Sequence, residues 1–363
     1  MLLLALALAL SQEAEPRSIA DLGPLVETVL AAHDVPALWA ATVDLDGLTG
    51  SGARGVRRRG TTRAVGLDDR LHLGSCTKSM TAALAVILSE EGQVTLGDSI
   101  ADPFPDFDVH AAWRPVTLRH LLAHRGGAPA NLVDYAPLGL FIAKHDGEPP
   151  THRRTLARAL LQSPPKHAPG EDFVYSNDGY ALVAAALEAR TGRAWRELLA
   201  AELFAPVGIV TFGFGPPDAF EDQPVGHTAA GEPAPLVDNP AAYGPAGRVH
   251  LPLEEWARYV AWNLCGARDG AAPLSKRDFE ALHVPALGGS YAAGWLRLER
   301  PWSKGHVLHH NGSNTVWMCA MWLAPAEGVA YIAATNQGGD AAGIAVDQMI
   351  AALIRSAGAT GSR

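Results

Sequence analysis

The chain has 363 residues, of which 48% are hydrophobic and 18% charged, and its formal net charge is −9. This composition is typical of a globular protein with a large core, folded as one large domain or two smaller ones. The negative charge argues against nucleic acid as the main partner. Cys76, Cys265 and Cys319 lack metal-like spacing and cannot all pair in disulfides, so we interpret them as small buried hydrophobic residues.

The N-terminus begins with an apolar run, residues 1–10, that is too short to span a membrane and suits the core of a signal peptide. Residues 9–11 resemble a cleavage site, although the usual preceding basic residues are missing. The sequence therefore predicts a signal peptide and leader over 1–16 and an exported protein, periplasmic or secreted. The alternative is a buried or disordered N-terminus. No other run approaches membrane-span length.

Apolar periodicity and turn residues predict the following elements in chain order. The first part of the chain has a helix over 18–33, strands over 38–43, 53–59 and 71–73, and a helix over 79–91. The middle has helices over 117–124, 156–161, 179–191 and 253–264, with a long irregular connection over 211–250. The last part has strands over 291–298, 306–310, 315–323 and 329–335, a helix over 341–354 and a disordered tail over 357–363.

Strands at both ends of the chain, with helices between them, predict an α+β fold. We expect the terminal segments, about 17–75 and 285–356, to share one sheet. The residues between them then form an inserted helical lobe, so that 17–356 make a single domain.

The first chemical signal is Ser75 followed by Lys78 at the start of a predicted helix. Residues at this spacing lie on the same helix face. A serine hydroxyl needs a base to become a nucleophile, and a lysine is that base when burial lowers its pKa toward neutrality. The positive end of the helix favours the negative charge that develops at Ser75. In isolation, this spacing more often reflects a capping serine and a solvated lysine.

The second signal is Tyr175 with Asn177, on a loop directly before a predicted helix. A tyrosine serves as a general acid or base or donates a hydrogen bond to a lysine. An asparagine amide is able to hold both the lysine and a substrate carbonyl. Taken alone, the segment is a turn with an asparagine cap.

The third signal is the segment 309–313, which precedes a predicted strand. Gly312 lets a substrate backbone approach closely. We expect the Ser313 N–H to pair with the Ser75 N–H as an oxyanion hole.

In this order, the three motifs resemble the serine β-lactamase and penicillin-binding-protein superfamily: Ser75-x-x-Lys78, Tyr175-x-Asn177 and His310-Asn311-Gly312. The Tyr-x-Asn form is similar to the class C branch and its related esterases and D-peptidases. Segments 81–83, 91–94 and 117–124 resemble the flanks in that branch, and the similarity spans about residues 20–355.

The resemblance implies an antiparallel sheet flanked by N- and C-terminal helices, with the site between sheet and helical lobe. It implies that Ser75 is acylated, that Lys78 accepts its proton and that Tyr175 serves both acylation and deacylation. Asn177 would position a substrate amide, and Asn131 loosely matches a substrate-contacting amide. The substrate-binding set is completed by the third motif: His310, Gly312 and Ser313.

Departures from the class C pattern put β-lactam specificity in question. Class C β-lactamases carry lysine where this chain has His310, and that lysine recognises the β-lactam carboxylate. Histidine is typical of esterase-like and peptidase-like members. Segment 244–252 lacks the usual Ser-Thr helix start, and Arg125-Gly126-Gly127 replaces a more polar turn.

Two rival functions remain at this point. The first is a metal site, because His306, His309 and His310 are close in sequence and His120 stands four residues before His124. However, no glutamate lies between His120 and His124 as the metalloprotease pattern requires, and such a pair more often packs against or caps its helix. A penicillin-binding protein or sensor that is acylated but turns over slowly is the other.

The sequence favours a cofactor-free, metal-free serine hydrolase of the esterase or D-peptidase type. It acts through an acyl-enzyme on a small ester, a D-amino-acid peptide or a β-lactam, and a genuine class C-like β-lactamase is the remaining alternative.

Overall fold

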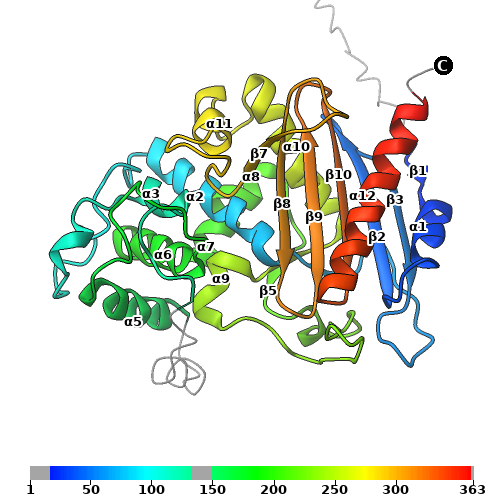
Figure 1. Ribbon diagram of the computed structural model, residues 1–363, viewed down its shortest axis with the longest axis horizontal. Coiled ribbons are helices and arrows are strands. Elements are labelled where there is room, and N and C mark those ends of the chain that lie inside the picture. Colours follow the sequence, from blue (N-terminus) through cyan, green and yellow to red (C-terminus); the bar gives the residue numbers. More distant parts are fainter. Residues whose placement is uncertain (1–16, 132–148, 361–363) are drawn as a thin grey trace, which may run out of the picture.

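The computed structural model describes residues 17–131 and 149–360, which form a sheet lobe and a helical lobe (Figure 1). The sheet has seven strands in the order β1-β3-β2-β10-β9-β8-β7. Their bounds are β1 Ala20–Asp21, β2 Ala37–Asp44, β3 Gly47–Gly55, β7 Leu296–Glu299, β8 His306–Ser313, β9 Met318–Ala324 and β10 Val329–Thr335. Every neighbouring pair is antiparallel except β1 with β3. The two ends of the chain therefore share one sheet, which confirms the α+β prediction.

The helices divide between the two lobes. Those on the sheet are α1 Gly23–Leu30, α10 Leu253–Asp269 and α12 Asp340–Thr360. The others are α2 Thr77–Glu90, α3 Leu118–Leu122, α5 Pro149–Gln162, α6 Asn177–Thr191, α7 Trp195–Leu198, α8 Ala205–Val207, α9 Gly244–Gly247 and α11 Lys276–His283. A second, three-stranded sheet has the order β4 Leu71–His72, β6 Val249–Leu251, β5 Gly213–Phe214.

Strand β2 explains why helices cover both faces of the large sheet. Successive side chains of a strand point to opposite faces, and all eight residues of β2 are buried or half-buried. Leu38 and Ala40 join the core layer formed with α1 and α12. Trp39 and Ala41 belong to the larger core, which includes α10 and α2. Figure 1 shows α12 on one face of the sheet and α10 on the other.

The start of α2 differs from the sequence-based expectation in a way that matters for the site. Ser75 lies in a 3₁₀ turn, Gly74–Cys76, and the α-helix begins only at Thr77. Gly74 adopts a left-handed φ of +45°, which turns the chain sharply out of β4. The nucleophile candidate therefore stands on a tight strand-to-helix turn.

Other differences concern short or terminal elements. Segment 211–250 contains β5, most of β6, α9 and two 3₁₀ turns, since strands of two or three residues are too short for an alternating pattern to reveal. The tail predicted as disordered from 357 continues α12 to Thr360, because its N-terminal turns pack on the sheet and the helix extends beyond them. The predicted signal peptide, 1–16, lies outside the described residues.

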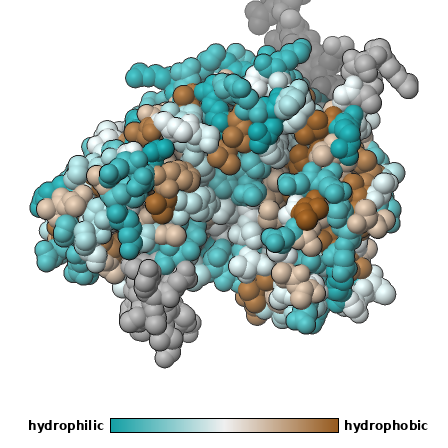
Figure 2. All heavy atoms as spheres, viewed as in Figure 1, coloured by the Kyte–Doolittle hydropathy of each residue, from teal (hydrophilic) through white to brown (hydrophobic). Residues whose placement is uncertain are grey.

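No helix in the described part of the chain is both long and apolar enough to cross a membrane. On the face shown in Figure 2, hydrophobic residues reach the surface in separate small patches, and the surface is hollowed between the helical lobe and the sheet.

Candidate active site

Ser75 and Lys78 lie together at the junction of the two lobes. The Lys78 Nζ is 3.1 Å from the Ser75 Oγ. Helix α2 is buried over almost its whole length, because Ala, Leu and Met side chains pack around it, and Lys78 is 0% exposed. The structure therefore brings Ser75 and Lys78, which the sequence predicts to be nucleophile and base, into hydrogen-bond contact.

The hydrogen-bond partners of Lys78 accommodate its neutral form, and burial is what favours that form. Two of them, the Asn177 Oδ1 and the Ala246 carbonyl, each lie 2.7 Å from Nζ and can only accept. A neutral amine has two N–H groups for these two oxygens, and its lone pair is then left for the third partner, the Ser75 hydroxyl. With Lys78 neutral, the serine O–H donates to the amine lone pair, whereas the protonated lysine donates to the Ser75 Oγ instead.

Burial lowers the pKa of Lys78 and so favours this neutral form. Desolvation within α2 lowers the pKa of Lys78 from its usual 10.5 to about 7. No carboxylate appears among its hydrogen-bond partners in the described residues to hold the proton on. A substantial fraction of the lysine is therefore neutral at physiological pH.

The amide of Asn177 is oriented from both sides. Its Oδ1 accepts from Lys78, and its Nδ2 donates to the Asn131 Oδ1 over 2.7 Å. The backbone N–H of Asn177 also donates to the Ala130 carbonyl at 2.9 Å. The loosely matched Asn131 thus contacts the site through Asn177.

Tyr175 covers the lysine. Its ring centroid lies 4.7 Å from the Lys78 Nζ, and 37% of the residue is exposed. Burial of its hydroxyl raises the pKa of Tyr175 well above its usual value, although a hydrogen bond with Ser75 works in the opposite direction. Tyr175 is therefore a protonated phenol at neutral pH and is able to donate or relay a proton beside Ser75.

The loop that carries Tyr175 is held by His124, which sequence reasoning assigned to packing or capping. The Ser176 N–H donates to the His124 Nδ1 at 3.0 Å, and the Val174 N–H donates to the His124 carbonyl at 2.9 Å. Both amides that flank Tyr175 are thus anchored to one residue, whose left-handed φ of +59° turns its carbonyl toward the loop. The His124 ring also packs against the Tyr175 ring, with centroids 4.3 Å apart.

The edge of β8 meets the nucleophile turn through two glycines. A Cβ added to Gly74 would lie 2.3 Å from the Ser313 N, and one added to Gly312 would lie 2.0 Å from the Leu73 carbonyl oxygen. No side chain fits between these backbones. The Ser313 amide therefore lies beside the residue that precedes Ser75.

His310 is the site residue whose surroundings the sequence did not anticipate. It is 3% exposed, and its Nδ1 lies 2.5 Å from the Asn311 carbonyl while its Nε2 lies 3.0 Å from the Tyr291 hydroxyl. Because a carbonyl only accepts, Nδ1 carries the proton and Nε2 accepts from Tyr291. Burial, together with the nearby Lys78, lowers the pKa of His310 to about 3. The imidazole is neutral, and both of its nitrogens are engaged within the protein.

Three contributors to the site were missed from the sequence: the Ala246 carbonyl, His124 and Tyr291. A backbone carbonyl acts regardless of residue type, so no sequence signal reveals Ala246. Tyr291 falls within a predicted strand that in fact begins only at Leu296. His124 stands directly before Arg125-Gly126-Gly127, and a helix end followed by glycines is the one signal that could have marked it.

Four of the histidines considered as metal ligands have other partners: His120, His124, His309 and His310. His120 forms a capping box with Thr117 at the start of α3, and the His309 ring stacks on Trp322 with centroids 3.8 Å apart. In 17–131 and 149–360, no three His, Cys, Asp or Glu side chains come together as metal ligands would. Cys76 and Cys319 are buried free thiols, whereas Cys265 is half-buried.

Comparison with known proteins identifies the family to which this geometry corresponds. The family model described as Beta-lactamase matches residues 24–355. Penicillin-binding protein 4 of Amycolatopsis lactamdurans is 29% identical over 84% of this chain and 82% of its own length. The D-aminopeptidase of Brucella anthropi is 27% identical over 81% of this chain, which spans only 54% of that longer protein.

Solved structures give the same fold. An octameric penicillin-binding protein homologue from Pyrococcus abyssi superposes with a TM-score of 0.73 and 22% identity, covering 90% of this chain and 75% of that one. The D-alanine carboxypeptidase AmpC from Burkholderia cenocepacia gives a TM-score of 0.71 and 18% identity, covering 90% and 96%. At this identity the likeness concerns the fold, which agrees with the expected sheet, flanking helices and helical lobe.

Proposed function

The chain belongs to the β-lactamase family, and we propose that it is a serine hydrolase that turns over small esters or short D-amino-acid peptides through an acyl-enzyme. The observation that carries the proposal is the contact between Ser75 and Lys78, in which two carbonyl-type oxygens occupy the lysine N–H groups. Penicillin-binding protein 4 and the D-aminopeptidase are relatives whose names agree with acyl-transfer chemistry.

Acylation begins when neutral Lys78 takes the proton of Ser75 and the Oγ attacks the substrate carbonyl carbon. The backbone N–H groups of Ser75 and Ser313 stabilise the oxyanion of the tetrahedral intermediate. The bond to the leaving group then breaks, and the proton on Lys78 passes to that group, relayed by Tyr175. Water then attacks the acyl carbonyl carbon while Lys78, again neutral, takes its proton. The bond from that carbon to the Ser75 Oγ breaks and the proton passes to Oγ, giving the acid and free Ser75.

The substrate class follows from charge. His310 is neutral and hydrogen-bonded to Tyr291, so the third motif supplies no cation for a substrate carboxylate. Asn177 and Asn131 offer amide contacts instead. We therefore place uncharged esters and peptides before anionic β-lactams as substrates. Export through the predicted leader at 1–16 fits substrates outside the cytoplasm and is part of the proposal.

A slowly turning-over penicillin-binding protein is the second candidate, favoured by the 29% identity to penicillin-binding protein 4 across most of both chains. Mass spectrometry of the protein mixed with a penicillin separates the two functions. A persistent adduct indicates a binder, whereas an adduct that disappears as product accumulates indicates an enzyme.

Replacing the nucleophile is the direct test of the proposal. Ser75→Ala is expected to abolish hydrolysis of p-nitrophenyl esters and labelling by a fluorophosphonate probe, because no other hydroxyl contacts the Lys78 Nζ in the described residues. Ser79→Ala, one turn further along α2, is the matched control, since the Ser79 hydroxyl donates to the Cys76 carbonyl instead. Labelling that persists in Ser75→Ala at another residue contradicts the assignment.

A further inference from the structure

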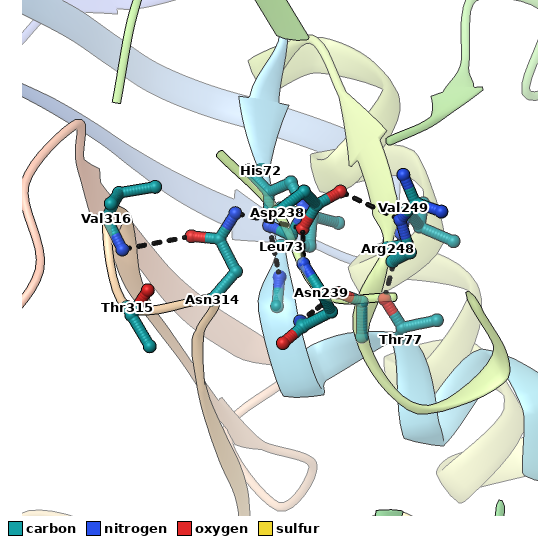
Figure 3. A network of polar contacts seen from close by, with 12 residues as sticks. His72, Leu73, Thr77, Asp238, Asn239, Arg248, Val249, Asn314, Thr315 and Val316 are labelled. Atoms are coloured by element: carbon teal, nitrogen blue, oxygen red, sulfur yellow. Dashed lines mark hydrogen bonds and ion pairs between the residues drawn. The ribbon is translucent and has the colours of Figure 1, made fainter. Parts of the chain in front are cut away.

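Asp238 is a buried carboxylate beside the nucleophile turn that takes no part in the proton transfers described above (Figure 3). Its side chain is 3% exposed. Arg248 Nε donates to its Oδ2 at 2.9 Å, and Asn314 Nδ2 and the Asn239 N–H donate to its Oδ1 at 3.1 and 2.7 Å. His72 Nε2 also lies 3.0 Å from Oδ1. One side chain thus joins four segments of the chain.

The carboxylate is ionised despite its burial. Desolvation by itself raises the pKa of Asp238, but His72 and Arg248 outweigh it and hold that pKa well below the usual range. An anion in this position attracts every donor around it and fixes their positions more firmly than a neutral acceptor does.

His72 carries the first connection from Asp238 to the nucleophile turn. The Gly74 N–H donates to the His72 Nδ1 at 3.1 Å, so Nδ1 has no proton and the ring hydrogen is on Nε2, facing Asp238. The His72 Nε2 lies 3.0 Å from the Asp238 Oδ1 without hydrogen-bond geometry, so the contact is an attraction between the ring and the carboxylate. The connection through His72 therefore ends at the backbone amide of Gly74, the residue immediately before Ser75.

Asn314 carries the second connection, to the end of β8. Its Nδ2 donates to Asp238, and its Oδ1 accepts the Val316 N–H at 3.3 Å, so the amide is fixed at both ends. Asn314 directly follows Ser313. Because Gly74 lies against the Ser313 amide with no room for a Cβ, the two connections hold opposite sides of one backbone contact.

We propose that Asp238 is the positioning residue of the oxyanion hole, setting the separation of the Ser75 and Ser313 N–H groups through His72 on one side and Asn314 on the other. The inference rests on the proposed function, since it requires an oxyanion at Ser75. Donors of an oxyanion hole act only within about 2.7–3.1 Å of the oxygen, so a small relaxation of either segment weakens them.

The test compares Asp238→Asn with Asp222→Asn. The first replaces the anion with an amide that cannot satisfy all four donors. The second is a matched control, because Asp222 is also paired with arginines, Arg57 and Arg63, but is bonded to none of the groups around Asp238. The measurement is kcat/KM for p-nitrophenyl acetate and for its thiono analogue, in which sulfur replaces the carbonyl oxygen.

Amides placed for oxygen stabilise the larger sulfur anion poorly, so the oxygen-to-sulfur ratio of kcat/KM reports the hole itself. We expect Asp238→Asn to lower kcat for the oxygen ester about tenfold or more, with KM unchanged, and to reduce the ratio. Binding of phenylboronic acid, whose tetrahedral adduct places an oxygen in the hole, weakens in parallel. Asp222→Asn leaves all three quantities at wild-type values.

An unchanged ratio in Asp238→Asn, with a lower rate, overturns the proposal and assigns Asp238 a purely structural role. If circular dichroism shows that this variant does not fold, Asn314→Ala decides by the same ratio, because it removes a single donor. The proposed function fails separately, if wild-type Ser75 is not labelled by the fluorophosphonate probe.

Discussion

At the scale of single residues, the protonation state of Lys78 decides whether Ser75 is a nucleophile. Its proton is removed by burial, and its two N–H groups are taken by the Asn177 amide and the Ala246 carbonyl. Neither effect requires a charged neighbour. The same lysine on an exposed helix would remain protonated near pKa ~10.4 and would not act as a base.

The pH dependence of hydrolysis follows from this state. A base with a pKa of about 7 is protonated and inactive below that pH, so kcat/KM for an uncharged ester is expected to rise through an inflection near 7 and then level off. His310, whose pKa is about 3, adds no inflection between pH 5 and 9.

Tyr175→Phe is expected to lower the plateau of kcat/KM by about 10²–10⁴-fold without moving the inflection.

A pH–rate profile of kcat/KM from pH 5 to 9 provides this measurement. A profile that is flat across pH 7, or that falls as the pH rises, would contradict the role of Lys78 as base.

His310→Lys tests the charge preference of the site. A lysine placed here adds a cation for a substrate carboxylate, so the ratio of kcat/KM for a chromogenic cephalosporin over that for an uncharged ester is expected to rise. The scale is about 1 kcal/mol, the difference between a charge-assisted and a neutral hydrogen bond. The assay compares both substrates at one pH near 7.5.

His309→Lys is its matched control, because the preceding side chain points to the opposite face of β8 and stacks on Trp322. A ratio that does not move in His310→Lys, or moves toward the ester, means that position 310 does not face the substrate carboxylate.

At the scale of elements, the site depends on the direct contact of the 3₁₀ turn before α2 with the edge of β8. Gly74 and Gly312 let the two backbones meet at distances that exclude a Cβ. This contact places the β8 amides beside Ser75, and it joins a segment near the N-terminus to one near the C-terminus.

Gly312→Ala is expected to destabilise the fold by about 1–3 kcal/mol, because its methyl group would overlap the Leu73 carbonyl and force the strand away from the turn. Gly97→Ala is the control, since a Cβ there meets nothing within 4 Å and Gly97 lacks a left-handed φ. The measurement is urea unfolding. Equal midpoints for Gly312→Ala and wild type would show that the strand and turn are not in tight contact.

At the scale of the whole molecule, the Lys78 amine is buried where the helical lobe meets the sheet lobe. Lys78 lies on α2, and its partners come from the nucleophile turn, α6 and α9, while β8 of the sheet lies against that turn. The molecule therefore loses folding free energy whenever Lys78 is charged. This is a cost in stability that a catalytic base at this position requires.

Lys78→Met should reveal that cost. The pKa of Lys78 is lowered on folding, so between pH 7 and 10.5 the unfolded chain binds the extra proton and wild-type stability rises with pH. The variant has no ionisable group at this position and lacks the contribution. The free energy of unfolding of the variant relative to wild type is therefore expected to fall by about 2–3 kcal/mol between pH 7 and 9.

Urea unfolding of both proteins at the two pH values gives this difference directly. A difference that does not change with pH, or that grows in favour of the variant, is incompatible with a lowered pKa at Lys78.

Much of the fold, and the grouping of Ser75, Lys78 and Tyr175 as candidate site residues, could be predicted from local signals. Ser75 and Lys78 are three residues apart, so helical geometry alone brings them together. The strand over 329–335 and the helix over 179–191, which the structure extends back to Asn177, could likewise be predicted, because composition and length distinguish them within a single segment.

The tertiary structure decided what depends on contacts distant in sequence. It buried Lys78 and so lowered its pKa, turned His310 toward Tyr291, anchored Tyr175 on His124 and gathered three other segments around Asp238. Residue type and spacing determine which groups a short segment presents. Desolvation, ring orientation and the backbone donors of an oxyanion hole arise only where separate segments pack against one another.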